Sequence, residues 1–131
     1  PASKINRCMI DHVVIADGCI VTDSSLKRCV IGIRSVLREN SELQEVVMMG
    51  ADYLQSDEQI QRDHAKGVPL LGVGRNCRIK GAIIDKNARI GDDVTLSPDG
   101  KADGDYPHGI VIRDGVLCVC KAAVIPSGFS L

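Results

Sequence analysis

The sequence contains almost no aromatic side chains: it has no tryptophan, only two tyrosines and a single phenylalanine. The core of a 131-residue chain usually relies on large rings, so this core has to be built from Ile, Val, Leu, Ala and Cys. Side chains of such similar size favour a narrow interior made of many repeated layers.

Neither sign of charge dominates the chain, because 16 basic residues stand against 17 acidic ones, for a net charge of -1. A surface that binds nucleic acid or an anionic membrane carries excess positive charge, so we expect neither partner. No apolar run approaches the roughly 18 residues that span a bilayer. The N-terminal PASKINRC lacks the apolar stretch of a signal peptide, so we expect a protein that is not secreted.

The six cysteines are not spaced like a metal site, because no C-x-x-C pair occurs. In a protein that is not secreted, cysteines usually stay reduced and pack as small apolar side chains. We therefore expect reduced cysteines, no metal ion and a cytosol-like compartment.

A period of six residues runs through much of the chain, as in VGRNCR from Val73, IDKNAR from Ile84 and IGDDVT from Ile90. Each hexad opens with an aliphatic residue, has polar turn-forming residues in the middle and often carries Cys or Ala fifth. Six residues make one short strand and one corner, and three such sides close a coil of about 18 residues. The first and fifth residues should point inward, with Gly or Asn at the corners. We predict an all-β parallel β-helix; a flat antiparallel β-sandwich is the alternative.

Two segments interrupt the period. The repeats lie at about 5–51 and 71–131, the first interruption at about 53–67 and the second at 97–107. In the first, Ser56 and Gln59 form a capping box and Gly67 provides a stop, which predicts a short helix. The second, SPDGKADGDYP, is polar and aperiodic, and we expect a mobile loop.

No catalytic centre is evident. The three histidines, His12, His64 and His108, are scattered, and none has a Ser, Cys or carboxylate partner at a spacing typical of nucleophilic catalysis. We therefore predict no catalytic residue in this chain. A hexapeptide acyltransferase, which would use one histidine as its base, is an alternative.

The basic residues, in contrast to the scattered histidines, are clustered in one part of the sequence. Five cations at outward-facing hexad positions fall within fifteen residues, namely Arg75, Arg78, Lys80, Lys86 and Arg89. Lys121 and Arg113 lie in later coils. Stacked coils bring distant residues to similar corners, so all of these cations could converge on a small anion such as phosphate. A solvated edge with scattered cations is the alternative, and the interruption at 97–107 leaves the register between Lys86 and Lys121 open.

Four stretches resemble a single family: PASKI at 1–5, VVMMGADY at 46–53, IIDKNARIG at 83–91 and CKAAVIPSG at 120–128. In this order they resemble the C-terminal domain of ADP-glucose pyrophosphorylase, also called glucose-1-phosphate adenylyltransferase. The resemblance implies a left-handed parallel β-helix of hexapeptide repeats with one short helical insertion. It also implies that a catalytic nucleotidyltransferase domain is absent from this chain.

The resemblance implies a role as well. The parent enzyme would convert ATP and glucose 1-phosphate to ADP-glucose and pyrophosphate for glycogen or starch synthesis, with magnesium in the missing catalytic domain. The present chain, without a cofactor of its own, would contact that domain and sibling subunits in a tetramer. It would also help to bind an anionic sugar-phosphate or phosphoglycerate-type effector. The compartment would be the bacterial cytoplasm or the plastid stroma.

The effector residues follow from two motifs of the family. Its two activator lysines lie in IIDKNAR and in a near-terminal K-x-A-x-I-P, which correspond to Lys86 and Lys121. Arg89 belongs to the first motif and is carried over with them. The resemblance therefore implies an effector site of Lys86, Lys121 and Arg89, with a ligand-free assembly module as the alternative.

Overall fold

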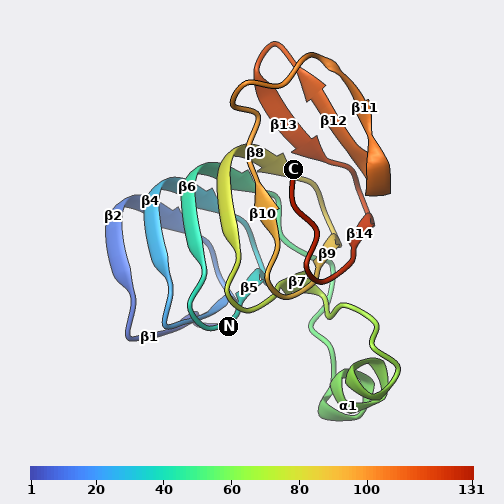
Figure 1. Cartoon of the computed structure of the whole chain (residues 1–131). Helices are drawn as coiled ribbons and strands as arrows, with labels where there is room; N and C mark the ends of the chain where they lie inside the picture. The colour runs from blue at the N-terminus through green and yellow to red at the C-terminus, as the bar shows by residue number, and fades with distance from the viewer.

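The computed structural model describes the whole chain, residues 1–131, as a stack of short coils with two projecting segments. In chain order the elements are β1 (Lys4–Asn6), β2 (Met9–Ile15), β3 (Ile20–Thr22), β4 (Ser25–Ile31), β5 (Val36–Leu37), β6 (Glu42–Met48), α1 (Asp57–Ala65), β7 (Gly72–Val73), β8 (Arg78–Ile84), β9 (Arg89–Ile90), β10 (Thr95–Leu96), β11 (Gly104–Tyr106), the 3-10 turn η1 (Pro107–Gly109), β12 (Ile110–Arg113), β13 (Val116–Val119) and β14 (Val124–Ile125). Figure 1 shows the coils side by side along one axis, with α1 projecting from one side and β11 to β13 from the other.

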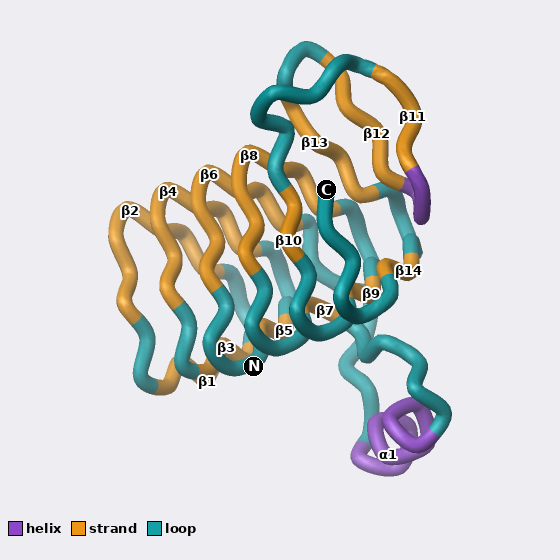
Figure 2. Tube along the Cα trace, in the orientation of Figure 1, coloured by secondary structure: helices purple, strands orange, loops and turns teal.

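Two sheets run along the stack (Figure 2). The first joins β1, β3, β5, β7, β9 and β14 in that order, and every pair is parallel. The second joins β2, β4, β6 and β8 in parallel and pairs β8 with both β10 and β13. Because all pairing between coils is parallel, the predicted β-helix is confirmed and the β-sandwich alternative is excluded.

Each seven-residue strand covers two sides of a coil, because the backbone turns at its fourth residue. These corner residues are His12, Arg28, Glu45 and Gly81, with φ of 54°, 51°, 55° and 60°. Only Gly81 is of a type that adopts this left-handed conformation without strain. The long side chains at the other three corners are the reason that these turns were not recognisable in the sequence.

The coils are shorter than the predicted 18 residues. Ser25 pairs with Glu42, seventeen positions later. In the first coil the spacing between paired residues is one residue shorter, because Met9 pairs with Ser25. The difference arises because the side with the left-handed corner has five residues instead of six, as between Ile79 and Ile84 around Gly81.

The aliphatic residues that open the hexads form the core. Ten of them are exposed by 2% or less: Val21, Ile31, Leu37, Leu43, Val73, Ile79, Ile84, Ile90, Val119 and Ile125. The small fifth residues Cys19, Cys77 and Ala88 are also buried, whereas Ala123 is only partly buried. The inward positions predicted from the period are therefore confirmed.

All six cysteines are free thiols, and Cys19, Cys29 and Cys77 pack inside the coils. Burial raises the pKa of the Cys29 and Cys77 thiols, which keeps them protonated. Cys120, in contrast, is exposed, so the expected role as a core hydrophobe does not extend to all six.

The first projecting segment carries α1. The Ser56 hydroxyl accepts from the Gln59 backbone N–H, and the Gln59 side chain accepts from the Ser56 backbone N–H, so the predicted capping box is present. The helix buries none of its side chains and ends just before Gly67, whose φ is 69°. No helix in the structure has the length and apolar character needed to cross a membrane.

The second projecting segment differs from the predicted loop at 97–107. Its last part forms β11, which pairs antiparallel with β12, and β12 pairs with β13 in the same way. The prediction of an aperiodic loop was wrong for Gly104–Tyr106, because this strand is specified by its partner and not by a repeat of its own. The Tyr106 hydroxyl also donates to the carbonyl of Ala102 at 2.6 Å.

Ion pairs connect corner residues of neighbouring coils. Arg7 donates to Asp23 at 2.6 Å, and Arg28 donates to Glu45 at 2.9 Å. These hydrogen bonds hold the pKa of Asp23 and of Glu45 below the usual range. The carboxyl groups therefore favour the folded state when they are ionised.

We expect the melting temperature to fall on acidification. A carboxyl group whose pKa is lowered by folding contributes stability above its unfolded pKa, near 4, and loses that contribution as the pH falls through the folded pKa. Melting followed by circular dichroism should be nearly constant from about pH 7 to pH 5.5 and should decline below about pH 4. Asp23→Asn should show a smaller decline, and a melting temperature unchanged down to pH 3 would contradict the prediction.

Candidate functional site

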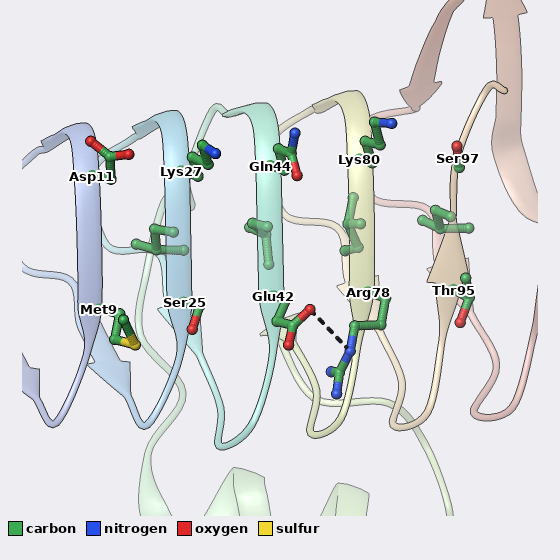
Figure 3. A pocket seen from close by; sticks show the side chains of 14 residues that line it. Met9, Asp11, Ser25, Lys27, Glu42, Gln44, Arg78, Lys80, Thr95 and Ser97 are labelled. Carbon is green, nitrogen blue, oxygen red and sulfur yellow. Dashed lines mark ion pairs between the residues drawn. The ribbon is translucent and has the colours of Figure 1, made fainter.

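The five cations that could have converged on one anion do not share one site. Each has its own acidic partner: Arg75 with Glu39 at 2.6 Å, Arg78 with Glu42 at 3.4 Å, Lys80 with Asp99 at 3.1 Å, Lys86 with Asp52 at 3.2 Å and Arg89 with Asp63 at 2.8 Å. Arg78 and Lys80 lie on the outer face of β8 (Figure 3). Lys86 lies instead in the turn that follows this strand. The hypothesis of a single cluster of five cations was therefore wrong.

Lys86 and Lys121, in contrast, occupy equivalent positions in adjacent coils. Ile84 pairs with Val119 before the corner, and Arg89 pairs with Val124 after it. The Ala122 backbone N–H donates to the Lys86 carbonyl at 2.9 Å. Backbones paired in this way lie about 4.8 Å apart. The two lysines thus share one edge of the stack, which the sequence register had left open.

Asp52 lies beside this pair of lysines. Its carboxylate accepts from the Lys86 ammonium at 3.2 Å and from the Asn87 side-chain amide at 2.9 Å. Hydrogen bonds from Asn87 and Lys86 are the main causes that lower the pKa of Asp52, and the positive charge of Lys121 contributes further. The carboxylate of Asp52 therefore stays ionised at neutral pH beside the two lysines of the corner.

The backbone also fixes Asp52 against the corner. Its N–H donates to the side-chain oxygen of Asn87 at 2.9 Å, and the Asn87 N–H donates to the Gly50 carbonyl at 3.1 Å. Asn87 has a φ of 62°, as expected for asparagine at a corner. Sequence reasoning did not single out Asp52, because it lies 34 residues before Lys86 and no local pattern connects the two positions.

Arg89 has a different environment from the lysines. Its guanidinium donates to Asp63 of α1 at 2.8 Å and to the Pro69 carbonyl at 3.0 Å. Both charged side chains are about one-fifth exposed, at 22% for Arg89 and 21% for Asp63. The Gln55 side chain also donates to Asp63 at 2.8 Å. Arg89 therefore holds the helical segment against the coil, next to a small cleft of about 180 Å³.

Two larger hollows lie away from the lysine corner. One, of about 500 Å³, lies on the outer face of β2, β4, β6, β8 and β10. Figure 3 shows its polar side chains in two rows across these strands, with the Glu42–Arg78 ion pair in one row. The other, also of about 500 Å³, lies between α1 and the coils and includes Arg38 and His64. Neither hollow is lined by Lys86 or Lys121.

The histidines form no nucleophile–base pair. His12 contacts its neighbour Asp11 at 2.5 Å on the exposed terminal coil. His108 packs edge-on against Phe129, with ring centroids 5.0 Å apart. No hydroxyl or thiol is hydrogen-bonded to any histidine, so the geometry offers no observation in favour of the acyltransferase alternative.

Comparison with known proteins shows similarity along almost the whole chain. Residues 1–129 match the model of a family described as the GLGC left-handed parallel beta-helix domain. The chain is also 35% identical, over 130 residues, to glucose-1-phosphate adenylyltransferase large subunit 1, chloroplastic/amyloplastic, of Zea mays. The alignment covers 98% of this chain and 25% of that relative, so the chain spans about a quarter of the relative's length.

Proposed function

The chain belongs to the family of GLGC left-handed parallel β-helix domains, and from that premise we propose that it is the regulatory and oligomerisation domain of a glucose-1-phosphate adenylyltransferase. The parent enzyme would join glucose 1-phosphate to the adenylyl group of ATP and release pyrophosphate. This reaction would take place in a separate nucleotidyltransferase domain that binds magnesium. The β-helix itself would contribute no catalytic group.

The observation that carries the regulatory part of the proposal is the shared edge of Lys86 and Lys121. The two side chains project from paired backbones of neighbouring coils. A single exposed ion pair contributes little to affinity, but a phosphate group can accept hydrogen bonds from two ammonium groups at once. An effector bound here with different affinities in two states of the enzyme would shift the balance between them.

The assembly part of the proposal is supported by the first coil. It ends the stack with a free strand edge on β2, and three apolar side chains there are exposed: Met9 by 76%, Ile10 by 44% and Val14 by 65%. A free edge and exposed apolar side chains are typical of a surface that is covered in an assembly. Sibling subunits or the catalytic domain would cover this surface.

The effector site can be tested with Lys86→Gln and Lys121→Gln in the full-length enzyme. Each change removes one charged donor, so the half-activating concentration of a phosphoglycerate or sugar bisphosphate should rise by about tenfold. Turnover without activator should stay the same, because neither lysine is part of the catalytic domain. Lys80→Gln is the matched control, since Lys80 lies on the outer face of β8 and pairs with Asp99.

A ligand-free assembly module is the second candidate function. It is favoured by the observation that Lys86 already has a carboxylate partner, Asp52, at 3.2 Å. Activation curves that coincide for the wild type and both lysine variants would support this second function and would contradict the effector site.

A further inference from the structure

Asp52 occupies the position at Lys86 that an anionic ligand would need. Its two carboxylate oxygens contact the Lys86 ammonium at 3.2 Å and the Asn87 amide at 2.9 Å. We infer that Asp52 is an internal counterion that a bound anion must displace from Lys86. This competition sets the affinity and the selectivity of the site, and the inference rests on the proposed effector site.

The carboxylate can leave without a change of fold. The backbone N–H of Asp52 is held separately by the Asn87 side-chain oxygen at 2.9 Å. The Asp52 side chain is 53% exposed and that of Lys86 is 43% exposed, so both can be solvated once they part. Rotation of the Asp52 side chain therefore releases Lys86 while the backbone stays in place. An exposed pair of this kind is weak enough for a ligand to break.

The internal carboxylate also favours one class of ligand. A monocarboxylate would replace Asp52 by a chemically similar group and would have to compete with a carboxylate that is tethered at high effective concentration. A phosphate monoester carries more charge and more acceptor oxygens, and it can contact Lys86 and Lys121 together. Because the Asp52 carboxylate competes for Lys86, the site should bind phosphate monoesters more tightly than monocarboxylates.

Asp85 is the other acidic side chain at this corner, and it plays a different part. Its carboxylate accepts from the Lys86 backbone N–H at 2.7 Å, which holds the side chain in the turn. It makes no hydrogen bond to the Lys86 ammonium, whereas Asp52 does. Asp85 would therefore remain in place when an anion binds, and Asp52 would be the carboxylate that moves.

A double-mutant cycle in the full-length enzyme tests the competition. Asp52→Asn should lower the half-activating concentration of the phosphorylated activator by about threefold to fivefold, because the internal competitor loses its charge. The same change in a Lys86→Gln background should have no effect, because no ammonium is left to release. Asp52→Ser serves as a second variant that keeps the backbone hydrogen bond to Asn87, and melting temperatures report whether each variant folds.

The outcomes separate this inference from the proposed function. If Lys86→Gln leaves activation unchanged, the effector site itself is wrong. If Lys86→Gln weakens activation but neither Asp52 variant strengthens it, the effector site stands and the role of Asp52 is overturned. Equal effects of Asp52→Asn with and without Lys86 would also overturn it, since the two side chains would then act independently.

Lysine acylation provides a readout that does not depend on activation. With an N-hydroxysuccinimide acetate reagent and mass spectrometry, Lys86 should react faster in Asp52→Asn than in the wild type, while Lys80 keeps its rate as an internal reference. Inorganic phosphate should slow the acylation of Lys86 more than formate does at equal ionic strength. An unchanged Lys86 rate in Asp52→Asn, or equal protection by formate, would overturn the inference.

Discussion

Replacement of Gly50 by alanine is expected to lower the free energy of unfolding by about 4 kcal/mol, the sum of a strained backbone and a steric clash. Gly50 has a φ of 96°, and an added Cβ would lie 2.1 Å from the Ile33 carbonyl oxygen. That oxygen cannot move away freely, because it accepts a hydrogen bond from the Ala51 N–H at 2.9 Å. Urea unfolding of both proteins measures the difference.

Gly100→Ala is the matched control for Gly50→Ala. Gly100 also has a positive φ, 71°, but no atom lies within 4 Å of the position that its Cβ would take. Only the conformational cost should remain, about 1 kcal/mol. Equal losses of stability in the two variants would show that the close approach of the coils at Gly50 does not contribute.

The second large effect is expected at the centre of the stack, where Leu43→Ala should lower the free energy of unfolding by about 3 to 5 kcal/mol. Leu43 is 2% exposed and lies between Leu26 of the previous coil and Ile79 of the next one. The cavity cannot close, because backbone hydrogen bonds fix the spacing of these coils at about 4.8 Å. The cost should therefore lie in the upper part of the usual range for leucine.

Gln44→Ala provides the comparison on the same strand. Gln44 follows Leu43 directly and points outward into the hollow of Figure 3, so its loss should change the free energy of unfolding by less than about 0.5 kcal/mol. Denaturant unfolding of the wild type and the two variants distinguishes the inward from the outward position. A loss of less than 1 kcal/mol for Leu43→Ala would contradict a tightly stacked core.

The inward side chains were predictable because the positions of the aliphatic and small residues within each hexad are sufficient to assign them. Ile84 and Ala88 could be assigned to the interior from the spacing within IDKNAR, and both are buried. The left-handed corners at Arg28 and Glu45 could not be found in this way, because those residue types do not mark a turn. The sequence therefore predicted the β-helix but overestimated the length of each coil.

The candidate site depended on information that no local pattern contains. The segment between β10 and β13 separates Lys86 from Lys121, and a repeat count cannot cross it without knowing where the chain rejoins the coil. The ion pair of Lys86 with Asp52 joins residues 34 positions apart across the helical segment. Resemblance to a family suggested the lysines, whereas the internal carboxylate became visible only in three dimensions.

The stack of coils also fixes the distance along its axis between the first coil and the lysine corner. Three coil steps separate the exposed first coil at β2 from the coil of β8 that leads into Lys86, which places the two surfaces about 14 Å apart along the axis. This distance can change only in whole coils, since a partial coil would turn the inward side chains outward. A partner that covered the first coil would thus be held at a fixed distance from the lysine corner, and adding or removing one coil would change that distance by about 4.8 Å.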